Sequence, residues 1–155
     1  MRANTMILGA LVVAGVAVSG ALVVGATRSD AAPASVVTVY KSATCGCCKE
    51  WVKHLEANGF AVRSVDVDNL QEMKAASGIP GPLASCHTAL VDGYVVEGHV
   101  PADLVKKMLR ERPAIAGLAV PGMPSGSPGM EGPRKDRYNV MAFEKGGSSH
   151  VYATR

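Results

Sequence analysis

The chain of 155 residues begins with a long apolar segment. Residues 6–26 carry no charge, follow the basic residue Arg2 and precede the small residues Ser29 and Ala31. A basic start, an apolar stretch and a small-x-small site are typical of a cleavable secretory signal. We therefore expect residues 1–31 to be a signal peptide. A retained N-terminal anchor in the inner membrane is the alternative, because a helical span needs about 20 apolar residues.

Beyond this segment, hydrophobic residues recur with the short period of strands or the longer period of helices. The expected strands cover residues 36–40, 61–67, 87–92 and 94–97. The expected helices cover the segment between Thr44, as its cap, and Asn58-Gly59, then residues 70–77 and 101–112. The dipeptide Asp92-Gly93 favours a tight hairpin between the last two strands. The order β-α-β-α-β-β-α predicts an α/β fold.

The C-terminal part of the chain has a different pattern. Residues 117–132 are rich in Pro, Gly and Ser and predict a long loop. A loop of this length in a small domain is usually functional or disordered. Two alternating segments then predict a β-hairpin over residues 138–154, which extends the sheet. Residues 36–155 are therefore expected to form one exported domain in the periplasm.

Composition narrows the possible functions. The chain is 48% hydrophobic and 19% charged, with a net charge of +3 and 4 Cys. These values exclude a disordered chain and a dense disulfide scaffold. The charge is modest and the basic residues form no stripe with interleaved aromatics, so we expect no nucleic-acid partner. A membrane is expected as a partner only if the N-terminal segment is retained.

Three of the four cysteines, Cys45, Cys47 and Cys48, lie at the start of the first helix. A thiol in the first helical turn faces unpaired N–H groups, so its pKa is expected to fall below the ordinary value of about 8.5. Thiolates attack disulfides and bind soft metal ions such as Cu(I). Cys45 and Cys48 suffice for dithiol chemistry, so the third thiol of Cys47 favours a metal. A structural disulfide is the alternative.

The element order, with Cys45-x-x-Cys48 between the first strand and the first helix, resembles the thioredoxin fold. This resemblance implies that the segment before the third strand passes beside the dithiol. Thioredoxins keep a cis-proline there, whereas this chain has Cys86-His87. The departure argues against ordinary disulfide exchange and supplies a fourth sulfur. Zn(II) is the competing metal, but C-x-C-C with one distant cysteine does not match its usual ligand spacing.

Cys86 and His87 have alternative roles. A disulfide from Cys86 to one of the other three cysteines competes with metal binding. His87 is a candidate ligand, and the alternative is a capping or surface residue because neighbours in a strand point to opposite faces. We interpret His99 as a capping residue before the last helix, with a metal ligand as the alternative, and His54 as a surface residue.

Two methionines, Met123 and Met130, lie in the loop over residues 117–132. Thioether sulfur binds Cu(I) and stays unprotonated at any pH. We expect the loop to close over a copper site with Met123 and Met130 as further ligands. Packing of both methionines on a surface patch is the alternative.

Four motifs together carry a resemblance to the CopG-type family of exported copper-resistance proteins, a thioredoxin-like domain. They are Tyr40-Lys41-x-x-x-Cys45-Gly46-Cys47-Cys48, Ser85-Cys86-His87-Thr88, Val95-x-Glu97-Gly98-His99-Val100-Pro101 and the loop Gly117-Leu118-Ala119-Val120-Pro121-Gly122-Met123-Pro124 with Gly126-Ser127-Pro128-Gly129-Met130-Glu131. The resemblance implies periplasmic copper handling, with the C-x-C-C cysteines holding Cu(I) singly or as a small cysteine-bridged cluster.

Three interpretations of the function follow from these residues. The first is a Cu(I)-binding protein of the bacterial cell envelope in copper resistance or homeostasis, with one or more ions held by the cysteines. Its partners are copper ions and other periplasmic copper-handling or redox proteins. The second is a thiol-disulfide or copper oxidoreductase, in which Cys45 attacks and Cys48 resolves. The third interpretation is a disulfide-stabilised binding module with unreactive thiols.

Overall fold

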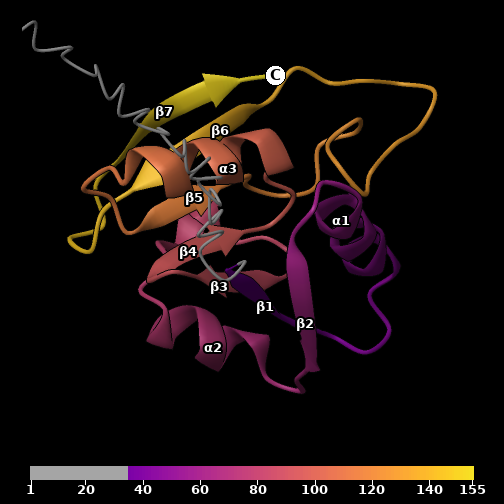
Figure 1. The fold of residues 1–155 in the computed structure, drawn as a ribbon, viewed down its shortest axis with the longest axis horizontal. Coiled ribbons are helices and arrows are strands. Elements are labelled where there is room, and N and C mark those ends of the chain that lie inside the picture. Colours follow the sequence, from indigo (N-terminus) through magenta and orange to yellow (C-terminus); the bar gives the residue numbers. More distant parts are fainter. Residues whose placement is uncertain (1–34) are drawn as a thin grey trace, which may run out of the picture. The chain divides into compact units, whose positions relative to one another are not determined.

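The computed structural model describes residues 35–155, so the signal peptide or anchor expected over residues 1–31 lies outside the described residues. The elements are β1 (Val36–Lys41), α1 (Gly46–Ala57), β2 (Ala61–Asp66), α2 (Leu70–Ala76), the 3-10 helix η1 (Gly81–Leu83), β3 (Thr88–Val91), β4 (Tyr94–Glu97), α3 (Ala102–Glu111), β5 (Gly117–Ala119), β6 (Asn139–Phe143) and β7 (Ser149–Thr154). The mixed α/β class and the order β-α-β-α-β-β-α are confirmed (Figure 1).

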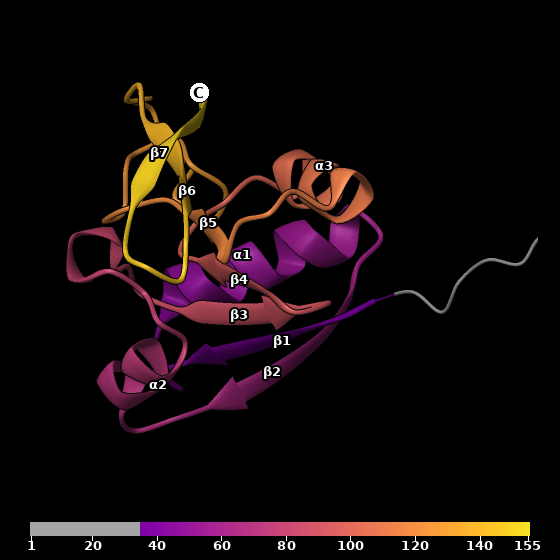
Figure 2. The same cartoon turned by 90° about the vertical axis from the view of Figure 1, so that its left-hand side faces the viewer.

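All seven strands form one sheet in the order β2-β1-β3-β4-β5-β6-β7. Figure 2 shows them one above the other, from β2 at the bottom to β7 at the top. The pairs β1–β2 and β4–β5 are parallel, and the other pairs are antiparallel. Between β3 and β4, Asp92 and Gly93 both adopt positive φ, as the predicted hairpin turn requires.

The predicted loop over residues 117–132 begins with a strand instead. In β5, Leu118 lies opposite Val96 of β4 and Ala142 of β6. A strand of three residues, one of them glycine, leaves too little alternation to be recognised, and neighbours on both sides decide its structure. The hairpin predicted over residues 138–154 is confirmed as β6 and β7, which extend the sheet.

The start of α1 also differs from the prediction, because Cys45 and not Thr44 occupies the N-cap position. The Thr44 hydroxyl lies 3.1 Å from the Ser42 hydroxyl and makes no bond to the helix. The helix therefore begins at Gly46 with no side-chain cap. Its first N–H groups therefore have no acceptor from the side chain of the N-cap residue.

Hydrophobic residues pack on both faces of the sheet. Val96 and Val95 are neighbours on β4, and they belong to different core clusters because adjacent strand residues point to opposite faces. The larger cluster contains the apolar residues of α1 and α3, among them Trp51, Leu55, Leu104, Val105 and Met108. The smaller cluster contains Leu83, Val95, Ala119 and Phe143. Helices α1 and α3 and the β5–β6 extension are thus fixed by burial against the same sheet.

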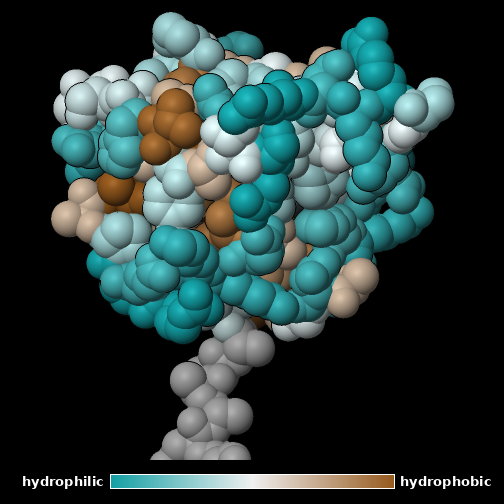
Figure 3. All heavy atoms as spheres, turned by 90° about the horizontal axis from the view of Figure 1, so that it is seen from above, coloured by the Kyte–Doolittle hydropathy of each residue, from teal (hydrophilic) through white to brown (hydrophobic). Residues whose placement is uncertain are grey.

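The face over the C-terminal hairpin is mostly hydrophilic, with hydrophobic residues in separate spots (Figure 3). Val151 of β7 is one of the exposed large hydrophobic side chains. Within residues 35–155, no helix is long and apolar enough to cross a membrane.

Candidate metal centre

The N-terminus of α1 places three cysteines together. Cys45 is the N-cap residue, Cys47 and Cys48 lie in the first turn, and Cys48 is fully buried. Cys45 and Cys48 form a disulfide, whereas Cys47 and Cys86 are free. Cys86 therefore does not form the disulfide that was the alternative to metal binding, because the disulfide of this structure joins Cys45 to Cys48.

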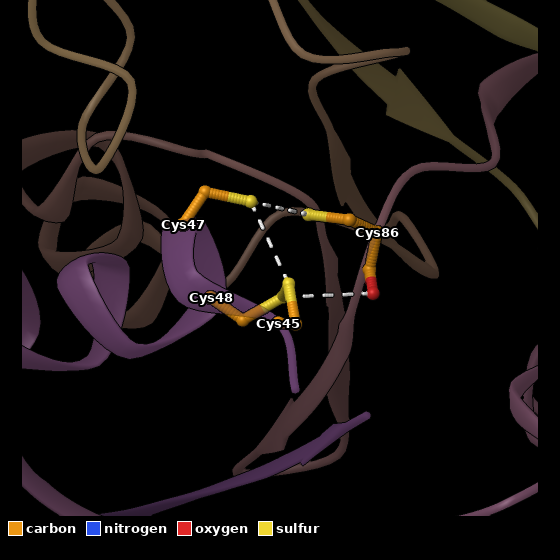
Figure 4. Close-up of side chains that lie close together, drawn as sticks. All are labelled: Cys45, Cys47, Cys48 and Cys86. Carbon is orange, nitrogen blue, oxygen red and sulfur yellow. Dashed lines mark hydrogen bonds between the residues drawn. A yellow bond between two sulfur atoms is a disulfide. The ribbon is translucent and has the colours of Figure 1, made fainter. Parts of the chain in front are cut away.

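The fourth cysteine approaches from the segment between η1 and β3, as Figure 4 shows. The Cys86 sulfur lies 3.9 Å from the Cys47 sulfur, and the Cys47 sulfur lies 3.5 Å from that of Cys45. The Cys48 sulfur is 3.7 Å from the Cys86 carbonyl oxygen. All four sulfur atoms lie within 4.8 Å of one another. The expectation that these four cysteines gather in space agrees with this geometry.

Burial of Cys86 controls its ionisation. Burial, and to a lesser extent the nearby thiol of Cys47, raises the pKa of the Cys86 thiol to about 12. Cys86 is therefore a neutral thiol at physiological pH while the site holds no ion. A metal that binds its sulfur must displace a proton.

His99 lies against this thiol, which favours the ligand role that was the alternative to capping. Its Nε2 is 3.0 Å from the Cys86 sulfur, and its Nδ1 is 2.7 Å from the carbonyl oxygen of Pro128. A carbonyl oxygen only accepts, so Nδ1 donates and, in a neutral imidazole, Nε2 keeps its lone pair facing the sulfur. Metal-binding histidines are usually fixed in this way by their second nitrogen. His99 is therefore a candidate ligand.

The capping role expected for His99 belongs to His54 instead. The N–H of Ala102, at the start of α3, donates to Nε2 of His54 over 3.1 Å. His54 is half-buried, not on the open surface, and burial lowers its pKa. Pro128 sets the orientation of His99, and Ala102 gives His54 its capping role. Both partners lie about 30 to 50 positions away in the sequence. Local sequence carried no signal for either contact.

His87 also lies at the thiols. Its Nδ1 is 3.2 Å from the Cys86 sulfur, so the two side chains do not point to opposite faces. The rule of alternation does not apply because β3 begins only at Thr88. His87 is fully buried against Trp51, with ring centroids 4.4 Å apart, and its Nε2 has no hydrogen-bond partner among the described residues. Burial lowers the pKa of His87 well below the ordinary value, so its imidazole is neutral and offers a nitrogen lone pair to a metal ion.

The loop after β5 closes over this region and is held by hydrogen bonds. Pro128 contacts His99, and a Cβ at Gly129 would lie 2.7 Å from the Cys47 carbonyl oxygen. Met123 is 53% exposed and lines a surface hollow together with Cys86. Met130 follows Gly129 and is half-buried. The predicted closure of the loop over the thiols agrees with these contacts, and ligation by the two methionines stays a prediction.

The chain is similar to a known protein family and to two solved structures. Residues 83–130 match the model of a family described as a protein of unknown function, DUF411. No curated protein matches the chain. Two solved structures, both named copper resistance protein CopG (Forms 1 and 2), are 48% identical to the chain with a TM-score of 0.75. Each match covers 79% of this chain and 99% (Form 2) or 98% (Form 1) of the other.

The chain belongs to the CopG-type copper-resistance family. The sequence resemblance on which this expectation was based is therefore confirmed. Membership and the cysteine cluster together support a copper-related role. The donor set of sulfur and neutral imidazole nitrogen suits soft metal ions and excludes a preference for hard ions such as Mg²⁺, which favour oxygen.

Proposed function

We propose that this chain is a Cu(I)-binding protein of the bacterial cell envelope that acts in copper resistance or homeostasis. The observation that carries the proposal is the gathering of four cysteine sulfurs from α1 and the segment before β3. Thiolate ligands favour Cu(I), and a thiolate can bridge two ions. Four sulfurs with the imidazoles of His87 and His99 beside them offer more donors than one Cu(I) needs. We infer a site for more than one ion.

The disulfide between Cys45 and Cys48 sets a condition on this function. Its reduction takes two electrons and two protons and gives two thiols, and binding of Cu(I) then releases protons from the thiols. The oxidised protein has only Cys47 and Cys86 as free thiols. We expect copper loading to depend on the redox state of this pair.

An anaerobic Cu(I) titration of the purified, reduced chain tests the proposal. We expect more than one Cu(I) per chain, fewer in the disulfide form, and fewer in Cys47→Ser and Cys86→Ser because each variant loses a sulfur of the cluster. One copper per chain that Cys47→Ser leaves unchanged would refute the multinuclear site. A reduced chain that binds no Cu(I) would refute the function itself.

The same titration assigns the loop methionines. If Met123 and Met130 are ligands, Met123→Leu and Met130→Leu weaken Cu(I) binding while keeping an apolar side chain of similar volume. Met141→Leu is the matched control, because Met141 packs beside the smaller core cluster in β6. Equal binding by all three variants would remove the methionines from the site.

A thiol-disulfide or copper oxidoreductase is the second candidate, and the disulfide itself favours it. Cys45 is half-buried at the end of the helix, whereas Cys48 is fully buried. This arrangement suits attack by Cys45 on a substrate disulfide and release of the mixed disulfide by Cys48. The substrate disulfide gains two electrons, and the Cys45–Cys48 dithiol loses them. Insulin reduction that Cys45→Ser abolishes and Cys47→Ser leaves intact would favour this function.

Localisation is part of the proposal. We infer export to the periplasm from residues 1–31, with copper ions and other periplasmic copper-handling or redox proteins as partners. Cell fractionation with mass determination of the mature N-terminus checks both points. A mature chain that starts near residue 32 indicates cleavage, and an intact chain in the inner-membrane fraction indicates an anchor.

A further inference from the structure

A buried ion pair lies beside the cysteine site without belonging to it. Lys74 of α2 is 4% exposed and Glu97 of β4 is not exposed at all, and Lys74 Nζ lies 2.5 Å from Glu97 Oε1. Removing two charges from water costs about as much free energy as their attraction returns, so such a pair contributes little net stability. The position of this ion pair in the fold therefore needs an explanation other than stability.

The carboxylate of Glu97 accepts hydrogen bonds from both sides of the Cys86-His87 pair. The backbone N–H of Ser85 donates to Oε1 over 2.5 Å, and the hydroxyl of Thr88 donates to Oε2 over 2.7 Å. With Lys74, three donors converge on one buried carboxylate. One side chain thus fixes the residue before Cys86 and the residue after His87.

The same carboxylate connects the two sides of the contact between Cys86 and His99. Glu97 lies two residues before His99 in the chain, and between them the N–H of Gly98 donates to the carbonyl oxygen of His87 over 3.0 Å. Gly98 has a φ of +67°, and a Cβ there would meet the Ser85 side chain. Glu97 and Gly98 therefore bring the Cys86 segment close to the chain that carries His99.

We propose that Glu97, held by Lys74, is the positioning residue that keeps the Cys86 thiol against Cys47 and His99. The proposal rests on the metal-binding function proposed above, but its geometric part concerns the metal-free protein. The bonds from the Ser85 backbone and the Thr88 side chain hold both ends of the segment that contains Cys86 and His87. Thioredoxins keep a cis-proline in this segment, whereas this chain has Cys86-His87 there.

Glu97→Gln tests this role with little change in shape. An amide has one accepting oxygen and an NH2 group that cannot accept, so the bonds from Lys74, Ser85 and Thr88 cannot all keep their present direction and charge. We expect alkylation of Cys86 in the metal-free disulfide form, followed site by site by mass spectrometry, to speed up about tenfold as the thiol becomes accessible. The wild type and the control variant described below give the reference rates, because the Cys47 thiol contacts Cys86 and changes with it. In the reduced form, we expect Cu(I) affinity to fall about tenfold or more.

Asp66→Asn is the matched control. Asp66 is the carboxylate partner of another buried lysine, Lys41, in the neighbouring part of the sheet, and it makes no other side-chain hydrogen bond within residues 35–155. The substitution removes one charge from a lysine pair in the same way as Glu97→Gln. We expect it to leave both the Cys86 alkylation rate and Cu(I) affinity unchanged.

The outcomes separate this proposal from the proposed function. Faster alkylation of Cys86 in Glu97→Gln but not in Asp66→Asn supports positioning, even if the wild-type protein binds no copper. Equal rates in wild type and folded Glu97→Gln, or an equal rise in Asp66→Asn, overturn it. If thermal melting shows that Glu97→Gln does not fold, Thr88→Val takes its place. This variant removes the donor to Glu97 Oε2 together with the hydroxyl oxygen that accepts from Lys74, and an unchanged Cys86 rate in folded Thr88→Val then overturns the proposal.

Discussion

At the scale of single residues, Cys86 is the point where distant parts of the chain meet. Its sulfur lies 3.9 Å from the Cys47 sulfur of α1 and 3.0 Å from Nε2 of His99. Its pKa is raised to about 12 by burial, so contact with these groups does not ionise it. A metal ion that binds the Cys86 sulfur displaces the proton and makes it a thiolate. The residue is thus suited to bind metal and poorly suited to attack a disulfide.

Gly129 is the residue at which the long loop meets α1. It has a φ of +84°, and a Cβ there would lie 2.7 Å from the Cys47 carbonyl oxygen and 2.8 Å from the Trp51 nitrogen. Gly129→Ala is expected to destabilise the protein by more than about 1 kcal/mol, because both the backbone conformation and the space forbid the methyl group. Urea unfolding measures the loss.

Gly132→Ala provides the control for this substitution. Gly132 has no neighbour within 4 Å of an added Cβ and no positive φ that would strain an alanine. We expect its unfolding midpoint to match that of the wild type. An equal midpoint for Gly129→Ala would show that the loop does not rest on α1 in solution.

At the scale of elements, β5 joins the C-terminal hairpin to the rest of the sheet. Its three residues pair in parallel with β4 and antiparallel with β6. Through this strand the sheet continues to β7, and the loop that follows β5 returns over the start of α1 at Gly129. The extension therefore stabilises the loop that covers the candidate metal centre, as well as the sheet.

The two strands of the hairpin are expected to differ in their contribution to stability. Phe143 of β6 is fully buried in the smaller core cluster, whereas Val151 of β7 is 51% exposed. Phe143→Ala is expected to lower the free energy of unfolding by about 3–5 kcal/mol, because it removes a ring and leaves a cavity. Val151→Ala is the control, with an expected change below about 0.5 kcal/mol. A loss for Phe143→Ala as small as the one expected for Val151→Ala would mean that Phe143 is not part of the core.

At the scale of the whole molecule, three buried or half-buried histidines make the stability of the folded state depend on pH. Burial is the leading cause that lowers the pKa of His54, His87 and His99 in the folded state. The unfolded chain keeps histidines near the ordinary pKa of about 6.5 and therefore binds more protons below that pH. Stability is expected to be full above pH 6.5 and to be lost as the pH falls below it.

Thermal melting of the metal-free protein between pH 8 and pH 5 measures this dependence. We expect the melting temperature to fall on the acid side, and to fall less steeply in His54→Gln, where an amide oxygen can still accept from Ala102. His150→Gln is the control because His150 is exposed. A melting temperature that does not decrease toward pH 5 would contradict the neutral, buried state of these histidines.

The sequence by itself determined the features that depend on neighbours along the chain. The periods of β1, α1 and α3, the Asp92-Gly93 turn and the order β-α-β-α-β-β-α were all predictable, because local periodicity decides which face is buried. Spacing also grouped Cys45, Cys47 and Cys48, and the motifs identified the family. That Cys86 joins them followed from the resemblance to the thioredoxin fold.

Only the tertiary structure decided the features that depend on contacts between distant residues. The carbonyl oxygen of Pro128 gives His99 its orientation, Ala102 makes His54 the capping residue, and β4 and β6 make a strand of β5. The same is true of Glu97, whose carboxylate meets Lys74, Ser85 and Thr88 only after α2, β3 and β4 have packed. Such contacts are set by burial and by the need to pair buried polar groups, which no local pattern records.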